Sequence, residues 1–186
     1  MMKHYYILSG KLLPRIIAVS CLFSILLSCQ NTVDTPTMGC SDMDMTTTIQ
    51  NKARTMNLTS SILFRQHSRN GGAKYLSIEA VSDTFKVILN LEDSRFEDDA
   101  DLSNDSIHLD TFLFSRTGPQ KGGLVVGAWK NSFGDYDYLT TDTSSITIKK
   151  INTKKKTISG SFYFLANDRK VLGEGSFENA CYLSLQ

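Results

Sequence analysis

The sequence predicts an all-β fold, a single antiparallel β-sandwich or barrel-like domain of about nine to eleven strands, which follows a signal peptide and a flexible tether. Two observations carry this prediction. Apolar residues alternate with polar ones along most of the chain after residue 75, which is the period of a strand with one buried face. Glycine- and asparagine-containing turn signals separate the alternating segments, and no window shows a helical apolar stripe with caps.

The first 28 residues have the parts of an export signal. The basic residues Lys3, Lys11 and Arg15 come first, without any acidic residue, and the mostly apolar segment 16–27 follows. That segment is short for a membrane span, which needs about 20 apolar residues. We therefore expect residues 1–28 to be a cleaved signal peptide, with a retained N-terminal anchor as the alternative.

Cys29 ends the run Leu26-Leu27-Ser28-Cys29, which resembles the lipobox of bacterial lipoproteins. The resemblance implies that the Cys29 thiol is acylated and that the protein is attached to the outer membrane through lipid, with the membrane face left open. Residues 29–42 are polar, contain Pro36 and Gly39, and are expected to form the lipidated tether. Residues 43–186 then form the β domain.

The charge of the mature chain gives no reason to expect nucleic acid as a partner. The leader holds three of the 20 basic residues and none of the 19 acidic ones, so the mature chain has a small negative net charge. Binding to nucleic acid depends on a basic surface.

Two cysteines remain after the leader and the lipid site are set aside, namely Cys40 and Cys181. An exported protein lies in a compartment that permits disulfides, so these two residues are a candidate bridge, with two unpaired thiols as the alternative. Because they lie far apart and no CxxC is present, they indicate neither a zinc site nor a redox motif.

The strand prediction rests on apolar residues at every second position. Such alternation covers residues 76–80, 85–91, 107–113, 146–148 and 158–164, with an apolar run at 124–129. In the third segment, Ile107, Leu109 and Leu113 are expected on the alternating face and Phe112 and Phe114 on the opposite one. The expected turns are Asn70-Gly71-Gly72, Gly118-Pro119, Gly122-Gly123, Phe133-Gly134-Asp135, Asn152-Thr153 and Asn167-Asp168.

The C-terminal third contains Ile146-Thr147-Ile148, then Ile158-Ser159-Gly160-Ser161-Phe162-Tyr163-Phe164, then Gly175-Ser176-Phe177-Glu178-Asn179. This order resembles the "ITI…ISGxFxF…GxFxN" ending of small Bacteroidota lipoproteins of unknown function. Residues 45–52 are similar to their opening strand and turn. The resemblance implies an antiparallel β domain on a lipid anchor, and it implies no activity. Within the pattern, Gly160 should leave room for a cross-strand aromatic ring or a bulge, and Gly175 should permit a bend.

An acidic stretch at 92–105 is the strongest local anomaly. Asp99, Asp101, Ser103 and Asp105 have the alternate spacing of a calcium loop, but the glycine and the closing glutamate are missing. We expect a solvated loop, with a weak Ca²⁺ site as the alternative. Paired carboxylates of a hydrolase are a second alternative, since glycosidases use two acids at defined separation.

Three other groups of residues are candidates for a function. The sequence Asp105-Ser106-Ile107 resembles an acceptor of Bacteroidota protein O-glycosylation, which makes Ser106 a candidate glycosylation site. His67 and His108 have no sequence-local partner and are expected on the surface. The lysines near the 146–164 hairpin suit either a charged turn that keeps edge strands apart or contact with anionic headgroups or glycans. They are Lys149, Lys150, Lys154, Lys155 and Lys156.

Aromatic residues suggest a ligand face. Tyr136 and Tyr138 share one strand face and, with Trp129, could form a platform for sugar stacking. Core packing is the alternative for Trp129, and ordinary sheet-surface pairing is the alternative for the tyrosines. The sequence contains no phosphate-binding glycine loop, nucleophile elbow or HExxH.

These observations favour an envelope lipoprotein that is not an enzyme and uses no cofactor. We expect a binding or accessory module, attached to the membrane by its N-terminal lipid, whose partner is a glycan, a peptide or a protein. A hydrolase that uses carboxylates of residues 92–105 and a purely structural envelope component are the alternatives.

Overall fold

The computed structural model describes residues 40–68, 71–96, 99–119 and 122–185. The predicted signal peptide, Cys29 and the tether up to residue 39 lie outside these residues. All described residues belong to one compact unit, Pro36–Gln186. Among the described residues, no helix has the length and apolar character that crossing a membrane would require.

The fold is all-β, as the sequence predicts. Its single described helix, α2 (Asp99–Leu102), is one turn long. The strands are β1 (Asp44–Ile49), β2 (Lys52–Thr55), β3 (Asn57–Ser68), β4 (Gly71–Val81), β5 (Phe85–Phe96), β6 (Thr111–Ser115), β7 (Gly123–Lys130), β8 (Tyr136–Tyr138), β9 (Thr141–Asn152), β10 (Thr157–Ala166), β11 (Val171–Cys181) and β12 (Leu183–Leu185).

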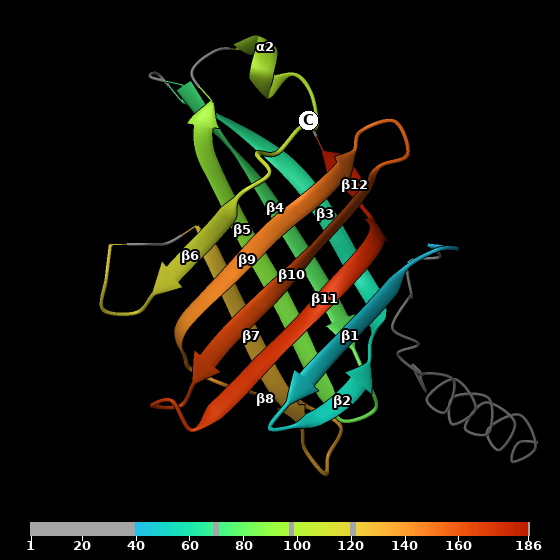
Figure 1. Ribbon diagram of the computed structural model, residues 1–186, viewed down its shortest axis with the longest axis vertical. Coiled ribbons are helices and arrows are strands. Elements are labelled where there is room, and N and C mark those ends of the chain that lie inside the picture. Colours follow the sequence, from blue (N-terminus) through green and yellow to red (C-terminus); the bar gives the residue numbers. More distant parts are fainter. Residues whose placement is uncertain (1–39, 69–70, 97–98, 120–121, 186) are drawn as a thin grey trace, which may run out of the picture. The chain divides into compact units, whose positions relative to one another are not determined.

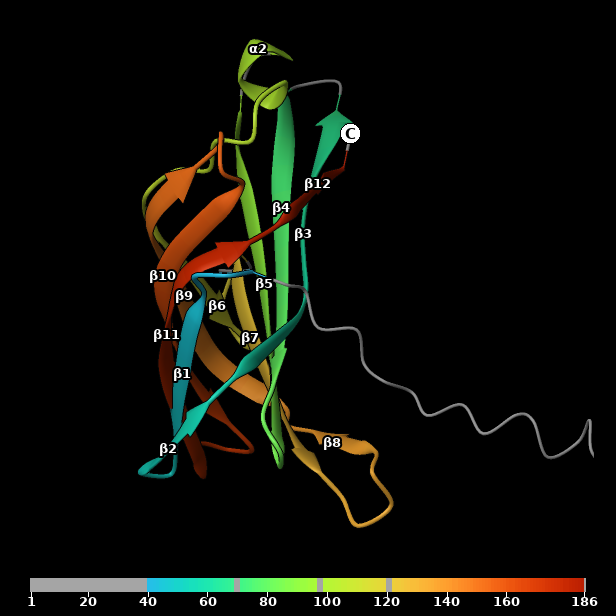
Figure 2. The same cartoon turned by 90° about the vertical axis from the view of Figure 1, so that its right-hand side faces the viewer.

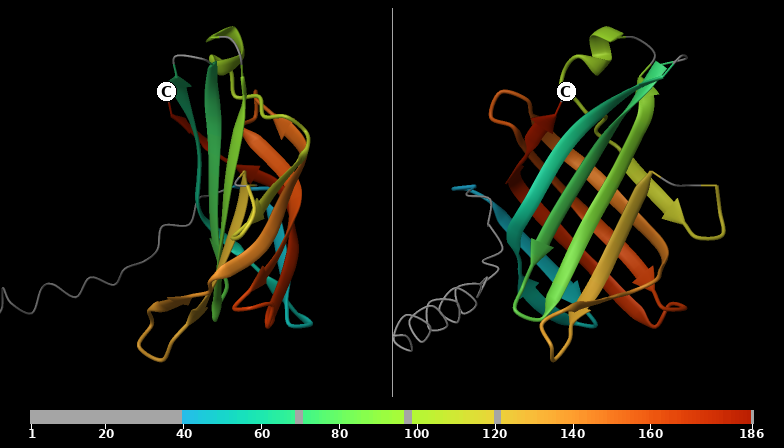
Figure 3. Two further views of the ribbon diagram at one scale, coloured as in Figure 1. Left: turned by 90° about the vertical axis from the view of Figure 1, so that its left-hand side faces the viewer. Right: turned by 180° about the vertical axis from the view of Figure 1, so that it is seen from behind.

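The strands form two six-stranded sheets that pack face to face as a β-sandwich (Figures 1 and 2). The first sheet has the order β2-β1-β11-β10-β9-β6, and the second has the order β12-β3-β4-β5-β7-β8. Figure 3 shows the two layers edge-on and then from behind, with the second sheet in front. The chain passes between the sheets after β2, β5, β6, β8 and β11, so each sheet combines segments that are distant in sequence.

Alternation places one face of each long strand in the core. In β5, Phe85, Val87, Leu89 and Leu91 are all at most 2% exposed, and the residues between them are not buried. Burying side chains of this size stabilises the fold by about 1.5–3 kcal/mol each. The core is therefore the layer between the sheets that the period-two pattern predicts.

Gly160 has the predicted role. A Cβ there would lie 2.7 Å from the ring of Phe177 and 2.2 Å from the carbonyl oxygen of Thr147, and the β9–β10 register shifts at this residue. Gly175 has a different role from the predicted bend. It lies inside β11, where a Cβ would lie 2.4 Å from the ring of Phe162. Both glycines let a buried aromatic ring lie directly on the neighbouring strand.

Three details differ from the prediction. The structure describes twelve strands, whereas the sequence predicts nine to eleven. The short strands β2, β8 and β12 have too few residues to show a periodic pattern of apolar residues. One strand pairing is not antiparallel, since β12 pairs with β3 in parallel. The third difference concerns the strand expected over residues 107–113, which begins only at Thr111. Its buried face carries Phe112, which is 7% exposed, whereas Leu113 on the other face is 43% exposed.

Cys40 and Cys181 form a disulfide with a Cα–Cα distance of 5.8 Å. Cys40 precedes β1, and Cys181 ends β11. The bridge therefore attaches the start of the domain to its last long strand. Because it closes nearly the whole domain, the chain-entropy model gives a stabilisation of about 4–5 kcal/mol.

Candidate functional site

The inner face of the second sheet changes from apolar to charged between two adjacent rows. Leu63, Leu76 and Leu91 are aligned across β3, β4 and β5, and each is at most 2% exposed. The next row contains Arg65, Lys74 and Asp93 in the same register. Lys74 is 0% exposed and Asp93 is 1% exposed, so these two residues are as deeply buried as the leucines, while Arg65 is half-buried.

Residues 99–110, here called the cap, follow β5 and lead to β6 at the end of the sandwich where α2 lies (Figure 1), and they contact the charged row. Two apolar side chains attach the cap to the core, because Leu102 is 1% exposed and Ile107 is 4% exposed. Leu102 packs on Gly72 of β4, where a Cβ would lie only 2.3 Å away. A glycine at this position is thus needed for the cap to approach the sheet.

Asp105 of the cap binds two cations from opposite sheets. Its carboxylate forms ion pairs with Arg65 of β3 and with Lys156 of the β9–β10 turn, and it accepts a hydrogen bond from the Ser184 hydroxyl at 2.7 Å. Burial alone would raise the pKa of Asp105, but the hydrogen bonds from Lys156, Ser184 and Arg65 outweigh it and lower the pKa. Asp105 is therefore an anion that joins the cap to both sheets.

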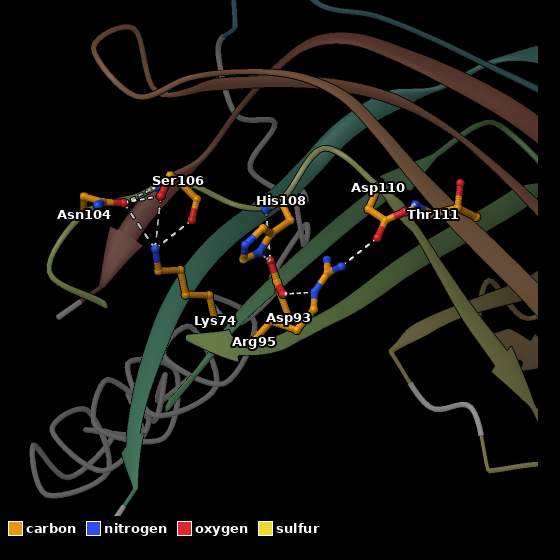
Figure 4. A network of polar contacts seen from close by, with 8 residues as sticks. All are labelled: Lys74, Asp93, Arg95, Asn104, Ser106, His108, Asp110 and Thr111. Atoms are coloured by element: carbon orange, nitrogen blue, oxygen red, sulfur yellow. Dashed lines mark hydrogen bonds and ion pairs between the residues drawn. The ribbon is translucent and has the colours of Figure 1, made fainter. Parts of the chain in front are cut away.

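Asp93 organises a second network, shown in Figure 4. Its carboxylate accepts the backbone N–H of His108 at 2.9 Å, lies 2.7 Å from Nδ1 of the same ring, and accepts Nε–H of Arg95 at 3.0 Å. Burial raises the pKa of Asp93, and these hydrogen bonds more than reverse that effect and lower it. Arg95 also donates to exposed Asp110 at 2.6 Å, which lowers the pKa of the Asp110 carboxyl.

Lys74 is a fully buried amine, drawn beside Asn104 and Ser106 in Figure 4. Its Nζ donates to the carbonyl oxygen of Ser106 at 2.7 Å and to Oδ1 of Asn104 at 3.2 Å, and it lies 3.9 Å from the Phe96 ring centroid. Burial and the nearby Arg65 charge lower the pKa of Lys74, while the Asp101, Asp93 and Asp105 charges act in the opposite direction. The cap thus supplies neutral acceptors to a lysine that belongs to the sheet.

A hollow of about 550 Å³ opens beside Asp105. Arg65, Asn104, Lys156 and Ser184 line it, together with residues of the β9–β10 turn. Tyr182 also contributes to its wall, although that residue is only 3% exposed. The buried hydroxyl of Tyr182 has no hydrogen-bond partner among the described residues, and burial followed by the Asp105 charge raises its pKa to about 12.

The aromatic residues predicted to form a ligand face are not brought together. Tyr138 pairs with Ala128, whereas Trp129 pairs with Asp137, so Trp129 lies on the opposite face of the sheet from both tyrosines. Trp129 packs inward against Phe85, with ring centroids 4.8 Å apart. Tyr136 and Tyr138 do share the outer face, where Tyr138 is 58% exposed and Lys86 lies 4.5 Å from the Tyr136 ring centroid.

The acidic stretch does not fold as a calcium loop around its candidate ligands. Asp99 and Asp101 lie on α2, while Asp105 is ion-paired to Arg65 and Lys156. Within the described ranges, no group of three or more His, Cys, Asp or Glu side chains could hold a metal ion. The candidate glycosylation residue Ser106 is partly buried, and its hydroxyl contacts Asn104. His67 is exposed on β3, near its end.

His108 has a partner that sequence reasoning missed, because Asp93 lies on a different strand. The same reasoning also missed Arg65, Lys74 and Asp93 as a unit. Their signal is present in the sequence, since each lies two residues from a leucine on the buried face of its strand. A charged residue at a position whose parity predicts burial indicates a buried polar cluster.

Comparisons with protein-family models, with curated proteins and with solved structures found no match for this chain.

Proposed function

We propose that this protein is a lipid-anchored lipoprotein of the cell envelope that acts as a non-enzymatic binding module, with the hollow beside Asp105 as its ligand site. The lipobox sequence ending at Cys29 supports the anchor. The Cys40–Cys181 disulfide is consistent with export, because disulfides persist mainly in oxidising compartments. The observation that carries the ligand site is the cationic lining of the hollow.

The charges around the hollow favour an anionic ligand. One carboxylate, Asp105, is shared by Arg65 and Lys156, so the wall has an excess of positive charge. The Lys156 side chain is 47% exposed and can turn one N–H toward a ligand while it remains near Asp105. Asn104 and Ser184 add neutral hydrogen-bonding groups. A carboxylate-bearing oligosaccharide combines the acid and hydroxyl groups that this wall can recognise.

The electrostatics favour binding over hydrolysis. A glycosidase needs a carboxylic acid whose pKa is raised so that it can protonate the leaving group. Asp93, Asp105 and Asp110 instead have lowered pKa values, because each accepts hydrogen bonds from cationic or backbone donors. All three are therefore suited to holding positive groups in place.

The ligand site can be tested by calorimetric titration of the domain with a short oligogalacturonate and with a neutral oligogalactose of equal length. Only the acidic sugar should bind, and Lys156→Met should weaken it about tenfold, the value of one charge-assisted hydrogen bond. Lys154→Met is the matched control, since Lys154 belongs to the same turn and is not part of the hollow. Equal binding of both sugars, or equal loss in both variants, would contradict the proposal.

The outer face at Tyr136 and Tyr138 is the second ligand surface within the same function. The Tyr138 ring is available for stacking, whereas one side of the Tyr136 ring is occupied by Lys86. If the double substitution Tyr136→Ala, Tyr138→Ala abolishes binding while Lys156→Met leaves it intact, the ligand site belongs on this face.

One observation supports a hydrolase as the second candidate function. Asp93 and His108 form a pair in which a buried carboxylate orients the imidazole through Nδ1, an arrangement that also activates nucleophiles in hydrolases. The nearby Ser106 hydroxyl contacts Asn104 and Lys74. A hydrolytic activity that His108→Ala removes without loss of folding would favour this function.

The anchor has its own test. Acylation of Cys29 predicts a mass increase in the membrane-bound protein that Cys29→Ala abolishes together with membrane retention. Full retention of an unacylated, cleaved variant would contradict lipid anchoring.

A further inference from the structure

The end of β9, the β9–β10 turn and the first residue of β10 carry five lysines within residues 149–157, here called the basic hairpin. Lys149, Lys150, Lys154 and Lys155 are exposed, and none of these four forms an ion pair or hydrogen bond through its side chain with another described residue. Lys156 alone is neutralised, by Asp105. The basic hairpin is therefore a local excess of positive charge on a domain whose overall charge is close to neutral.

Protection of a sheet edge explains only part of this charge. β9 pairs with β6 along residues 143–147, so Lys149 and Lys150 follow the part of β9 that is paired on both sides. Lys154 and Lys155 lie in the turn, where no strand edge needs protection. The turn lysines thus call for a different explanation.

The basic hairpin lies where the chain enters the domain. Thr157, its last residue, pairs with Cys181, and Cys181 is bonded to Cys40. Lys155 and Cys40 line the same hollow of about 320 Å³, together with Asp42 and Asn179. The disulfide therefore fixes the start of the domain beside the turn lysines.

Residues 30–39 separate Cys40 from the proposed lipid site at Cys29. A fully extended chain of ten residues spans at most about 35 Å. A lipid anchor at Cys29 consequently keeps the basic hairpin within reach of the bilayer surface. This step rests on the lipid anchoring given under the proposed function.

We propose that the basic hairpin is a docking surface for anionic phospholipid headgroups and that it orients the anchored domain on the membrane. Each lysine near an anionic leaflet strengthens binding about fivefold. Lys154 and Lys155, at the tip, contribute most, and Lys149 and Lys150 add to the same field. Docking leaves the opposite ends of the strands, at the β1–β2 and β10–β11 turns, facing away from the lipid.

The test uses the unlipidated domain, residues 36–186, because this compact unit contains the whole described fold. Its cosedimentation is measured with vesicles of phosphatidylcholine alone and with vesicles that also contain phosphatidylglycerol. Only the anionic vesicles should bind, more weakly as salt rises. The pair Lys154→Gln, Lys155→Gln should reduce binding about 25-fold. The matched control pair is Lys52→Gln, Lys170→Gln, which removes two exposed lysines from the other end of the strands.

Several results would overturn the proposal: no binding to anionic vesicles, equal binding to neutral ones, or equal loss in the control pair. Displacement from vesicles by millimolar inorganic phosphate would also contradict it, because it would assign the lysines to a free anion. The domain carries no lipid in this experiment, so absence of acylation at Cys29 would not change the result. Failure of the anchor and failure of the docking surface are thereby separated.

Discussion

The middle of the sandwich and its capped end use the same three strands in opposite ways. In the middle, Leu63, Leu76 and Leu91 pack against the other sheet. One row further, Arg65, Lys74 and Asp93 occupy equivalent inward positions and contact the cap. The difference shows that alternation along the strand decides which residues face inward. What covers the strand decides whether these inward residues are apolar or charged. The other sheet covers the leucines, and a polar segment covers the charges.

The largest expected effect comes from breaking the charged row. Asp93→Ala should lower the free energy of unfolding by about 3–5 kcal/mol, because the buried carboxylate accepts hydrogen bonds from the His108 backbone, the His108 ring and Arg95, and all three lose their acceptor. Urea unfolding of the purified domain measures it. Asp110→Ala is the control, since Asp110 is an exposed partner of the same Arg95 and should change stability little. Similar losses of stability in both variants would show that the buried carboxylate stabilises the fold no more than the exposed one does.

The next effect compares neighbours of equal burial on β4. Leu76→Ala should cost about 3 kcal/mol, because it leaves a cavity in the apolar middle. Lys74→Met should cost about 1 kcal/mol or less, since a buried cation can be replaced by an apolar side chain of similar volume. Thermal or urea unfolding of both variants gives the comparison. If Lys74→Met lowers the free energy of unfolding as much as Leu76→Ala does, the charged row stabilises the fold more than we infer.

Acid should affect the capped end before it affects the middle. The pKa values of Asp93 and Asp105 are lowered in the folded protein, so their contribution is present above the unfolded-state value and is lost as pH falls through the folded one. The free energy of unfolding should therefore fall as pH drops below about 4, which is near the ordinary aspartate pKa. The slope should be smaller for Asp105→Asn and unchanged for Leu76→Ala. A steeper slope for Asp105→Asn would contradict the sign.

The smallest effect is expected at Tyr182, where the two regions meet. Its ring belongs to the apolar core, and its buried hydroxyl lacks a partner among the described residues. Tyr182→Phe should therefore leave stability unchanged or raise it by about 1 kcal/mol, because it removes an unsatisfied polar group. Calorimetric melting provides the measurement. A loss of 1 kcal/mol or more would show that the hydroxyl has a stabilising partner.

Most of the fold is predictable from local pattern. The alternation in β4, β5, β9 and β10 and the turn signals between strands follow directly from the sequence. The strand prediction over residues 107–114 is wrong for a physical reason. Apolar residues occur there at both odd and even positions, so the pattern does not indicate which face is buried. The backbone of His108 is held by Asp93 instead, which keeps the start of this segment in the cap and delays β6 until Thr111.

The candidate site is less predictable, because it depends on register between distant strands. Trp129 and Tyr138 lie close in sequence, yet the β7–β8 pairing puts them on opposite faces. Asp105 is part of an acidic stretch in the sequence, but its partners lie 40 and 51 residues away, Arg65 on β3 and Lys156 in the β9–β10 turn. Charge clusters of this kind require the fold before their members can be identified.

The most direct test of the central inference, an anion-binding hollow beneath the cap, is amide chemical-shift mapping with a short oligogalacturonate. The account predicts saturable shifts at Arg65, Asn104, Lys156 and Ser184, and none with the neutral oligogalactose. Shifts centred on Tyr136 and Tyr138, or no shifts at any sugar concentration, would contradict it.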